Sequence, residues 1–435
     1  MSWPERPLPL SHQTLDPGVL SSSQLSVPIR RVASDRRAHW FGYYDIAAFD
    51  RTGTKVLCCA SDFEWRAPTA ADKLDVGVID LAQGGHFAAL GTSRAWSWQQ
   101  ASLLQWRPNR DSEVLWNDRI GDSSVTRIHN LESGEQRVLD TAFYALSGDG
   151  KSALACNLDR LEWMRPGYGC APIDRPTHRA PDDDGVFLVD LEHGRKTLIV
   201  SLERIASHEA DAYPGAHCWH YVNHLSFCPD GVHFAAIHRW RRSLRVPRAY
   251  RAVLGFGSRL LVGTLDGQRL WVVDDSGHTS HFAWRTPTHI VAWTRPRGRC
   301  SGLYSIDVHS GITVQLPGFD ENGHHSYLTL PGETSATWMV NDTYPKPSRL
   351  RQQLYVVHLA SGRRYDLGEF SIASPLKIGE TRCDLHPRIS PDGARICFDS
   401  AHEGRRQLYI AELGELISSE KKQTLSLNKR ATDNL

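Results

Sequence analysis

The chain has 435 residues, with 50 Lys and Arg against 49 Asp and Glu, and a formal net charge of +1 at pH 7. This balance excludes the strongly basic surface by which many proteins recruit nucleic acid or an anionic membrane. With 40% hydrophobic and 23% charged residues the composition is that of a globular protein. The sequence has no run of the roughly 20 apolar residues that a membrane span needs.

The N-terminal sequence and the cysteines bear on cellular location. Proline and charged residues interrupt MSWPERPLPLSHQTLDPGVL, so no secretory signal peptide is recognisable. The nine cysteines are scattered without a CxxC pair, which argues against a disulfide framework and against a cysteine-based zinc site. We therefore expect a cytoplasmic protein with reduced thiols that binds neither nucleic acid nor membranes.

A strand–turn–strand pattern recurs along the chain. Its copies are YYDIAAFDRTGTKVLCC from Tyr43, YALSGDGKSALAC from Tyr144, NHLSFCPDGVHFAAIHR at 223–239 and DLHPRISPDGARICFDS at 384–400. The D-G step supplies the positive φ of a tight hairpin turn, and the flanking residues alternate with the period of two that is typical of strands. A third apolar run, such as GVFLVDLEHG or LYSIDVHSG, follows each hairpin and predicts a third strand.

Such units begin near residues 41, 102, 143, 223, 281, 325 and 386. A repeat of several strands every roughly 40 to 80 residues is typical of β-propellers. No sustained apolar run has helical spacing, so we expect little helix. The sequence therefore predicts an all-β fold, a seven-bladed β-propeller.

The segments outside the repeats predict how the ring ends and what covers it. The strand-like LSVPIRRVAS at 25–34 precedes the first blade, and we expect it to complete the seventh blade and so close the ring. The propeller is predicted to span 23–416, between flexible ends at 1–22 and 417–435. The insertion at 157–184 is too long for a hairpin loop, and we expect it to fold over one mouth of the ring.

Histidine occurs at the same point of four consecutive units. The four are His224 in NHLSF, His281 in SHFAW, His324 in GHHSY and His386 in LHPRI. Equivalent positions on the inner strands of a propeller converge on its channel, so we predict that these imidazoles form a metal site, from which His325 points away. Asp384 would add an oxygen ligand, and this donor set favours Mn or Zn over Ca. The alternative is that each histidine caps a turn within its own blade.

Basic and aromatic residues form a second cluster, with HRWRR at 238–242 and two arginines, Arg160 and Arg165, in the blade-three insertion. Guanidinium groups grip carboxylates and aromatic rings stack on sugars, so this cluster predicts a site for an acidic oligosaccharide. The alternatives are a solvated rim and packing between blades. Candidate stacking residues include Trp96 and Trp98. The predicted substrate-binding residues are Gln99, Gln100, Arg165, Tyr168, Trp219 and Arg239.

With SHFAW in blade five and DLHPRISPDGARICFDSAHEGRRQLYIAEL in blade seven, the sequence resembles the oligogalacturonate lyases. These are cytoplasmic seven-bladed propellers whose metal is held by channel histidines. The resemblance implies that His281 and His386 are metal ligands. The chain departs from the family before the blade-seven ligand, where it has Thr381 and Asp384 in place of a glutamine and a second histidine.

The front half of the chain is similar to the ulvan lyases and rhamnose-glucuronate lyases, in which a Tyr and an Arg sixteen residues apart in blade three are catalytic. This similarity implies that Tyr144 is the catalytic tyrosine and that Arg160 neutralises the substrate carboxylate, and we expect the two side chains to be neighbours. The upstream catalytic histidine of those enzymes falls near Gln99, which cannot transfer a proton. Tyr144 would then serve both proton transfers, or His220 or His238 would act as base or acid.

Together these patterns predict a metal-dependent carbohydrate lyase that cleaves a uronic-acid-containing oligosaccharide by β-elimination. A metal ion or an arginine would stabilise the charge that builds on the carboxylate, and a positioned base would remove the proton beside it. The alternative is a non-catalytic propeller, resembling that of TolB, whose rim binds a protein or peptide. A hydrolase of the prolyl-oligopeptidase type is excluded because the sequence has no GxSxG motif.

Overall fold

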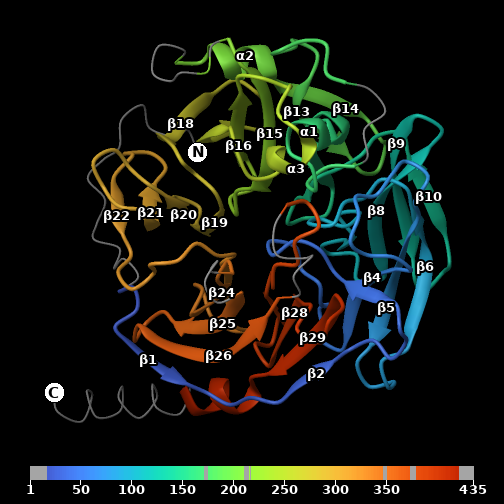
Figure 1. Ribbon diagram of the computed structural model, residues 1–435, viewed down its shortest axis with the longest axis vertical. Helices are drawn as coiled ribbons and strands as arrows, with labels where there is room; N and C mark the ends of the chain where they lie inside the picture. Colours follow the sequence, from blue (N-terminus) through green and yellow to red (C-terminus); the bar gives the residue numbers. More distant parts are fainter. Residues whose placement is uncertain are drawn as a thin grey trace.

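Seven small sheets are arranged in a ring in the computed structural model of this chain (Figure 1). The structure describes residues 17–170, 175–209, 215, 217–345, 350–372 and 379–420. Apart from two N-terminal strands, the strands of each sheet follow one another in chain order from the innermost to the outermost, and neighbouring strands of the repeat are antiparallel. The predicted all-β, seven-bladed propeller is confirmed.

The first four blades each contain four strands. Blade one comprises β3 (Ala38–Trp40), β4 (Lys55–Ser61), β5 (Leu74–Asp80) and β6 (Phe87–Ser93). Blade two comprises β7 (Gln105–Trp106), β8 (Glu113–Ile120), β9 (Ser123–Asn130) and β10 (Gln136–Leu139). Blade three comprises β11 (Ala145–Leu146), β12 (Ser152–Ala155), β13 (Gly185–Asp190) and β14 (Lys196–Ser201). Blade four comprises β15 (Trp219–Phe227), β16 (His233–Arg241), β17 (Gly257–Thr264) and β18 (Leu270–Gly277).

The last three blades complete the ring. Blade five comprises β19 (Phe282–Thr286), β20 (His289–Thr294), β21 (Gly302–Asp307) and β22 (Thr313–Gln315). Blade six comprises β23 (Ser326–Leu328), β24 (Trp338–Asp342), β25 (Arg351–His358) and β26 (Arg363–Ser371). Blade seven comprises β27 (Arg388–Ile389), β28 (Arg395–Ser400) and β29 (Gln407–Glu412). Each innermost strand begins within about four residues of its predicted blade start. In blades three, four and seven a D-G step forms the turn after this strand and sets the register of the hairpin.

Two N-terminal strands extend the outer edges of blades six and seven, and Figure 1 shows them beside β26 and β29. The first, β2 (Ile29–Arg31), pairs antiparallel with β29 and forms the fourth strand of blade seven, inside the segment 25–34. The second, β1 (Ser21–Gln24), pairs parallel with β26 and was not predicted. Its four residues are polar and all four side chains are exposed, so the sequence shows no alternation of apolar and polar residues that would predict a strand. Backbone pairing alone holds β1 in place.

The predicted domain boundaries therefore shift at both ends. Residue 23, the predicted start of the propeller, lies inside β1. Beyond residue 416, Ile417 is buried, and the buried carboxylate of Glu420 accepts hydrogen bonds from Arg363 and Tyr365 of blade six. The chain thus still packs on the propeller at 417–420. The rest of both predicted flexible ends, 1–16 and 421–435, lies outside the described residues.

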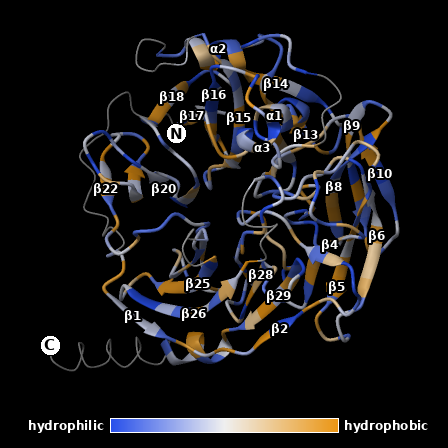
Figure 2. Ribbon diagram, viewed as in Figure 1, coloured by the Kyte–Doolittle hydropathy of each residue, from blue (hydrophilic) through white to orange (hydrophobic). Residues whose placement is uncertain are grey.

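Buried apolar side chains fill the interfaces between neighbouring blades, and Figure 2 shows hydrophobic stretches on many of the strands. Trp96 and Trp98 illustrate this packing, with ring centroids 6.0 and 4.9 Å from that of Trp40. Each is 1% exposed. They are therefore part of the core between blades one and two, and the suggestion that they stack on a sugar is wrong for the conformation described.

The helices of the described residues are short and none is both long and apolar enough to cross a membrane. The structure has α1 (Leu158–Met164), α2 (Leu202–Ser207) and α3 (Arg248–Arg251), and residues 414–420 are helical as well. Helix α1 begins the insertion between β12 and β13, and its N-cap Asn157 accepts a hydrogen bond from the backbone of Arg160. Further along, the carbonyl of Gly167 accepts a hydrogen bond from the backbone of Gln99, so the insertion reaches across to the start of blade two.

A buried arginine joins the last blade to the first. Arg388, at the start of β27, lies 2.8 Å from Asp399 and donates hydrogen bonds to the carbonyls of Gly42 (2.5 Å) and Tyr43 (3.0 Å). Arg388 and Asp399 are 2% and 1% exposed. This pair holds the segment that follows β3 against blade seven, and it directs Tyr43 towards the centre of the ring.

We expect Arg388→Met to lower the free energy of unfolding by about 3–5 kcal/mol, because it leaves the Asp399 carboxylate buried without its partner. Urea denaturation measures this loss. The matched control is Arg51→Met, since Arg51 forms an ion pair of similar length with Asp111 (2.9 Å) whose side chains are 79% and 55% exposed. That substitution should cost at most about 1 kcal/mol. Equal losses in the two variants would contradict a structural role for the buried pair.

Candidate functional site

The four predicted histidines meet at the centre of the ring. His224 lies in β15, His281 directly precedes β19, and His324 and His386 lie two residues before β23 and β27. Consecutive ring centroids are 5.5, 4.5 and 4.3 Å apart. All four side chains are buried. The structure thus brings the four predicted imidazoles together in one cluster.

Backbone strain is concentrated at two of these residues. His224 and His386 have φ values of 50° and 40°, in the left-handed region. This conformation costs roughly 1–2 kcal/mol for an L-amino acid, and such strain clusters at functional sites. His224 owes its conformation to an irregularity in the pairing of β15 with β16. The neighbouring His325 points away as predicted, because its Nε2 lies 3.0 Å from the carbonyl oxygen of Val291.

In three of these histidines, hydrogen bonds on the side away from the cluster determine which ring nitrogen carries the proton. The Nδ1 of His324 lies 2.9 Å from Asp342, and the Nδ1 of His281 lies 3.3 Å from the amide oxygen of Asn322. His386 makes a hydrogen bond to the backbone of Gly42, and its Nε2 has no hydrogen-bond partner among the described residues. An oxygen acceptor at Nδ1 places the proton there and leaves the Nε2 lone pair free to bind a metal.

Burial keeps two of these rings neutral. It lowers the pKa of His281 and of His386 well below the ordinary 6.5, and the neighbouring His324 lowers both further. Only a neutral imidazole can donate a lone pair to a metal ion. At neutral pH these two rings therefore carry a lone pair that is available for donation.

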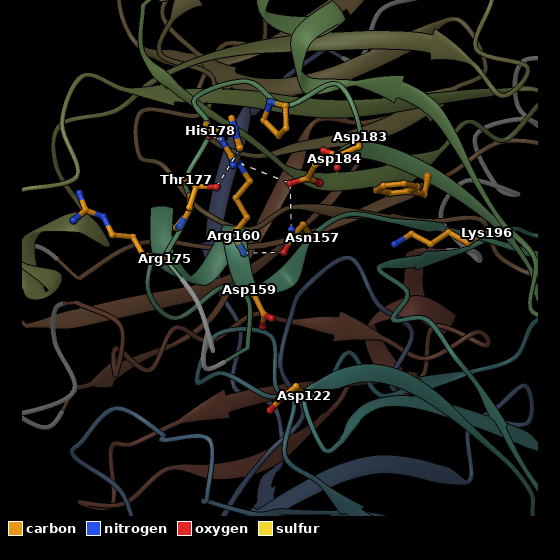
Figure 3. A pocket seen from close by; sticks show the side chains of 13 residues that line it. Asp122, Asn157, Asp159, Arg160, Arg175, Thr177, His178, Asp183, Asp184 and Lys196 are labelled. Carbon is orange, nitrogen blue, oxygen red and sulfur yellow. Dashed lines mark hydrogen bonds and ion pairs between the residues drawn. The ribbon is translucent and has the colours of Figure 1, made fainter.

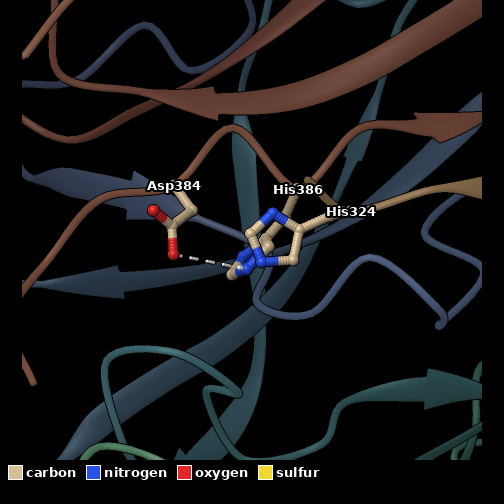
Figure 4. A group of neighbouring side chains, drawn as sticks. All are labelled: His324, Asp384 and His386. Carbon is tan, nitrogen blue, oxygen red and sulfur yellow. Dashed lines mark ion pairs between the residues drawn. The ribbon is translucent and has the colours of Figure 1, made fainter. Parts of the chain in front are cut away.

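The predicted carboxylate lies beside the histidines. Asp384 is buried, and its Oδ2 is 3.8 Å from the Nε2 of His386 (Figure 4). His324, Asp384 and His386 offer ligand atoms that all lie within 4.8 Å of one another. Both oxygens of Asp384 accept from the Nε of Arg382, at 2.6 and 2.7 Å. The arginine compensates the buried negative charge and holds the carboxylate in place.

Three tyrosines that the sequence analysis did not select complete the cluster. The hydroxyl of Tyr43 lies 3.2 Å from the Nε2 of His224, and that of Tyr344 lies 3.2 and 3.1 Å from the Nε2 atoms of His281 and His324. The hydroxyl of Tyr44 donates a hydrogen bond to the carbonyl of Phe282 in blade five (3.0 Å). No sequence pattern marked Tyr344, because it lies in the loop after β24 rather than in the repeat.

Arg165 and Tyr168, on the insertion, meet at the same centre. The guanidinium carbon of Arg165 lies 4.0 Å from the centroid of the Tyr168 ring, and its Nη2 donates to the Tyr168 hydroxyl (3.2 Å). The Nε and Nη1 of Arg165 are buried and have no hydrogen-bond partner among the described residues. After burial, the Arg165 charge is among the causes that lower the pKa of His224 and His281, which reflects its proximity. A buried guanidinium with unused donors is suited to a carboxylate.

Arg239 and Trp219 lie on blade four. Arg239 donates hydrogen bonds to Asn223 (3.0 Å) and to the carbonyl of Ser280 (3.1 Å). Burial, together with the charge of Arg165, lowers the pKa of Arg239 to about 10. Trp219 is half-buried at the start of β15. Of these two, the structure brings Arg239 close to Arg165.

The two glutamines support their neighbours. The Gln99 side chain donates to the carbonyl of Arg382 (2.6 Å) and the Gln100 side chain donates to the Tyr144 hydroxyl (2.6 Å). Both glutamines are buried. Their hydrogen bonds fix the residues beside the cluster.

Tyr144 and Arg160 are not brought together, although they have the spacing of the catalytic pair. Tyr144 accepts hydrogen bonds from Gln100 and from the backbone of His224 (3.0 Å). Arg160 lies on helix α1 rather than on a strand, and it donates to the carbonyl of His178 (Figure 3). It also donates to the carbonyls of His220 (2.7 Å) and Arg179. Burial and then the charge of Asp45 raise the pKa of Tyr144 above its ordinary value.

His220 and His238 form a separate pair within blade four. The Nδ1 of His220 lies 2.9 Å from the Nε2 of His238, and the Nδ1 of His238 accepts from the Nε of Arg259 (3.0 Å). Because an arginine can only donate, the Nδ1 of His238 is an acceptor and the proton of His238 lies on Nε2, which then donates to the Nδ1 of His220. Burial lowers the pKa of His220 to about 4.

Two features control access to the cluster. On the side of the insertion, Arg248 bridges Glu162 (2.5 Å) and Glu380 (2.7 Å), and so ties the insertion to the segment that precedes blade seven. On the side of the hairpin turns, a cavity of about 590 Å³ is lined by Asp45 and Tyr144, among others. Because Tyr144 is hydrogen-bonded to His224, this cavity extends to the edge of the cluster.

Comparisons with known proteins place the fold. No family model and no curated protein matches the sequence. An oligogalacturonate lyase in complex with manganese matches with a TM-score of 0.60 and 16% identity, over 89% of this chain and 93% of that one. The oligogalacturonate lyase of Vibrio parahaemolyticus matches with a TM-score of 0.60 and 14% identity, over 89% and 94%. TolB from Acinetobacter baumannii matches with a TM-score of 0.36 and 14% identity, over 68% and 59%. The chain thus shares its seven-bladed propeller fold, over nearly its whole length, with the oligogalacturonate lyases.

Proposed function

We propose that this protein is a metal-dependent lyase that cleaves a uronic-acid-containing oligosaccharide by β-elimination. The observation that carries the proposal is the buried cluster of imidazoles, in which Nδ1 of three rings is engaged outward, next to a guanidinium with unused donors. Fold neighbours that are oligogalacturonate lyases, one of them a manganese complex, support it.

The residues that would hold the metal are His281, His324, His386 and Asp384. The unpartnered Nε2 of His386 fits this role, and three imidazoles with one carboxylate suit Mn or Zn better than Ca, which prefers oxygen ligands. When bound, such an ion stabilises the negative charge that develops on a substrate carboxylate as the adjacent C–H bond is broken. His224 lies at the edge of this set, next to Tyr43.

Arg165 would bind the carboxylate of the sugar whose proton is removed. Its Nε and Nη1 have no hydrogen-bond partner among the described residues, and each can donate to a carboxylate oxygen. The buried surroundings strengthen this contact, because little water competes for it. Tyr168 and Arg239 would fix the orientation of Arg165 and of the sugar ring.

We assign proton transfer to Tyr344 rather than to Tyr144. The Tyr344 hydroxyl lies between the Nε2 atoms of His281 and His324, whereas the Tyr144 hydroxyl is occupied by two donors at the edge of the cluster. Burial raises the pKa of Tyr344, and the neighbouring Arg382 opposes this effect. A positioned base of this kind contributes roughly 10²- to 10⁴-fold to the rate.

The direct test combines metal analysis with a substrate screen. Protein purified without a histidine tag should contain about one Mn or Zn per chain, and uronate oligosaccharides should yield a conjugated product that absorbs in the ultraviolet. Removal of the metal with a chelator should abolish product formation, and its return should restore it. A folded, metal-free protein that releases no such product would contradict the proposal and favour the alternative of a propeller that binds a protein or peptide.

We further propose that the protein acts in the cytoplasm on imported oligosaccharides. All nine cysteines are free thiols, eight of them buried, which supports a reducing compartment. Cell fractionation with an antibody against the chain would test this location.

A further inference from the structure

One buried carboxylate joins two histidines from different blades. Asp342 is the last residue of β24, and its side chain is 0% exposed. Its Oδ1 accepts the backbone N–H of His324 (2.7 Å) and lies 2.9 Å from the Nδ1 of the same residue. Its Oδ2 accepts the backbone N–H of His386 (3.0 Å). Asp342 therefore links the segment before blade six to the segment before blade seven.

Asp342 acts on the ring of His324 and on the backbone of His386. Both oxygens of Asp342 accept backbone N–H groups, so the carboxylate acts as an acceptor here, places the proton of His324 on Nδ1 and leaves Nε2 as a lone-pair donor. At His386 the hydrogen bond secures a backbone whose φ of 40° is unfavourable for an L-amino acid. The two rings then lie with their centroids 4.3 Å apart.

We propose that Asp342 is the positioning residue of the histidine cluster. It fixes the tautomer of His324 and the backbone conformation of His386, so that the Nε2 lone pairs of both residues point to the same metal ion. The consequence for metal binding rests on the function proposed above. The effects on tautomer and backbone do not, because they arise from hydrogen bonds within the chain.

The variant Asp342→Asn tests the consequence for metal binding. The amide replaces one acceptor oxygen with an N–H₂ donor, so at least one of the three histidine N–H groups loses its partner. We expect the affinity of the full chain for Mn²⁺, measured by competition with a chelating dye, to fall about 10- to 100-fold. The visible spectrum of the Co²⁺-loaded protein should change as well, because it reports the geometry of the ligands rather than stability.

The matched control is Asp118→Asn in blade two. Asp118 is 5% exposed and accepts hydrogen bonds from the backbone of Arg94 (2.8 Å) and from the Nε of Arg127 (2.6 Å). Its loss should lower stability without changing Mn²⁺ affinity. An Asp342→Asn protein that folds and binds Mn²⁺ as tightly as the unsubstituted chain would overturn the proposal.

A second measurement needs no metal and reports on the unsubstituted chain. Side-chain ¹⁵N spectra of histidine-labelled, unsubstituted protein, assigned with His324→Gln, should show His324 as the Nδ1–H tautomer. An Nε2–H tautomer would overturn the role of Asp342. If the unsubstituted chain binds neither Mn²⁺ nor Zn²⁺, the proposed function fails, and the tautomer still decides whether Asp342 positions His324.

Discussion

His386→Ala should remove the bound metal ion and the lyase activity together, while the ring stays folded. The Nε2 of His386 has no hydrogen-bond partner among the described residues and lies 3.8 Å from Asp384, so under the proposed function it belongs to the metal ligands. Since the loss of a supporting residue already costs roughly 10- to 100-fold in metal affinity, the loss of a ligand should cost at least about 100-fold. Elemental analysis and ultraviolet product assays measure the two effects, and thermal unfolding reports the fold.

The control for this variant is His325→Ala. His325 is as deeply buried as His386, but its ring faces the carbonyl of Val291 in blade five. It should lose stability, because the carbonyl loses its partner and a cavity forms, yet retain its metal. Full metal content in His386→Ala, or equal metal loss in both variants, would refute the assignment of His386 as a ligand.

Tyr344→Phe should lower kcat by about 10²- to 10⁴-fold with little change in KM. The substitution keeps the ring, which lies 4.8 Å from the guanidinium carbon of Arg382, and removes only the hydroxyl that lies between His281 and His324. Steady-state kinetics on the oligosaccharide identified in the screen measures this effect. A metal content equal to that of the unsubstituted chain would separate the loss of a proton-transfer group from the loss of the metal.

Tyr144→Phe is the matched comparison, since it also removes a single tyrosine hydroxyl that is hydrogen-bonded to the cluster. We expect it to keep most of the turnover, because its hydroxyl serves as an acceptor for Gln100 and for the backbone of His224. The reverse result, with activity lost in Tyr144→Phe and kept in Tyr344→Phe, would make Tyr144 the base. Activity in both variants would move the assignment to the His220 and His238 pair.

The repeat and the candidate ligands could be predicted because both depend on local sequence. A hairpin with a D-G turn fixes its own register, and Gly231 and Gly393 have the expected φ values of 73° and 75°. In a ring of like blades, equal positions in the repeat occupy equal positions in space. The recurrence of His-x-x-hydrophobic in four units therefore indicated the cluster of imidazoles, whose consecutive centroids are at most 5.5 Å apart.

The partners of those ligands depend on contacts between distant segments. The repeat places Tyr43 on a strand, but β3 ends at Trp40, and Arg388, from the other end of the chain, holds Gly42 and Tyr43 by their carbonyls. The spacing between Tyr144 and Arg160 fits a catalytic pair, but a capped helix turns Arg160 towards the carbonyl of His220.

By itself the sequence determined the seven blades, their approximate starts and the residues that offer imidazole nitrogens, because these follow from periodicity and hairpin turns. Only the tertiary structure decided that Asp342 serves His324 and His386, that Tyr344 lies between two Nε2 atoms, and that Arg165 keeps unused donors. The physical reason is that a hydrogen bond across blades depends on how strands and loops far apart in the chain approach one another within a few tenths of an ångström. No spacing along a single sequence encodes that approach.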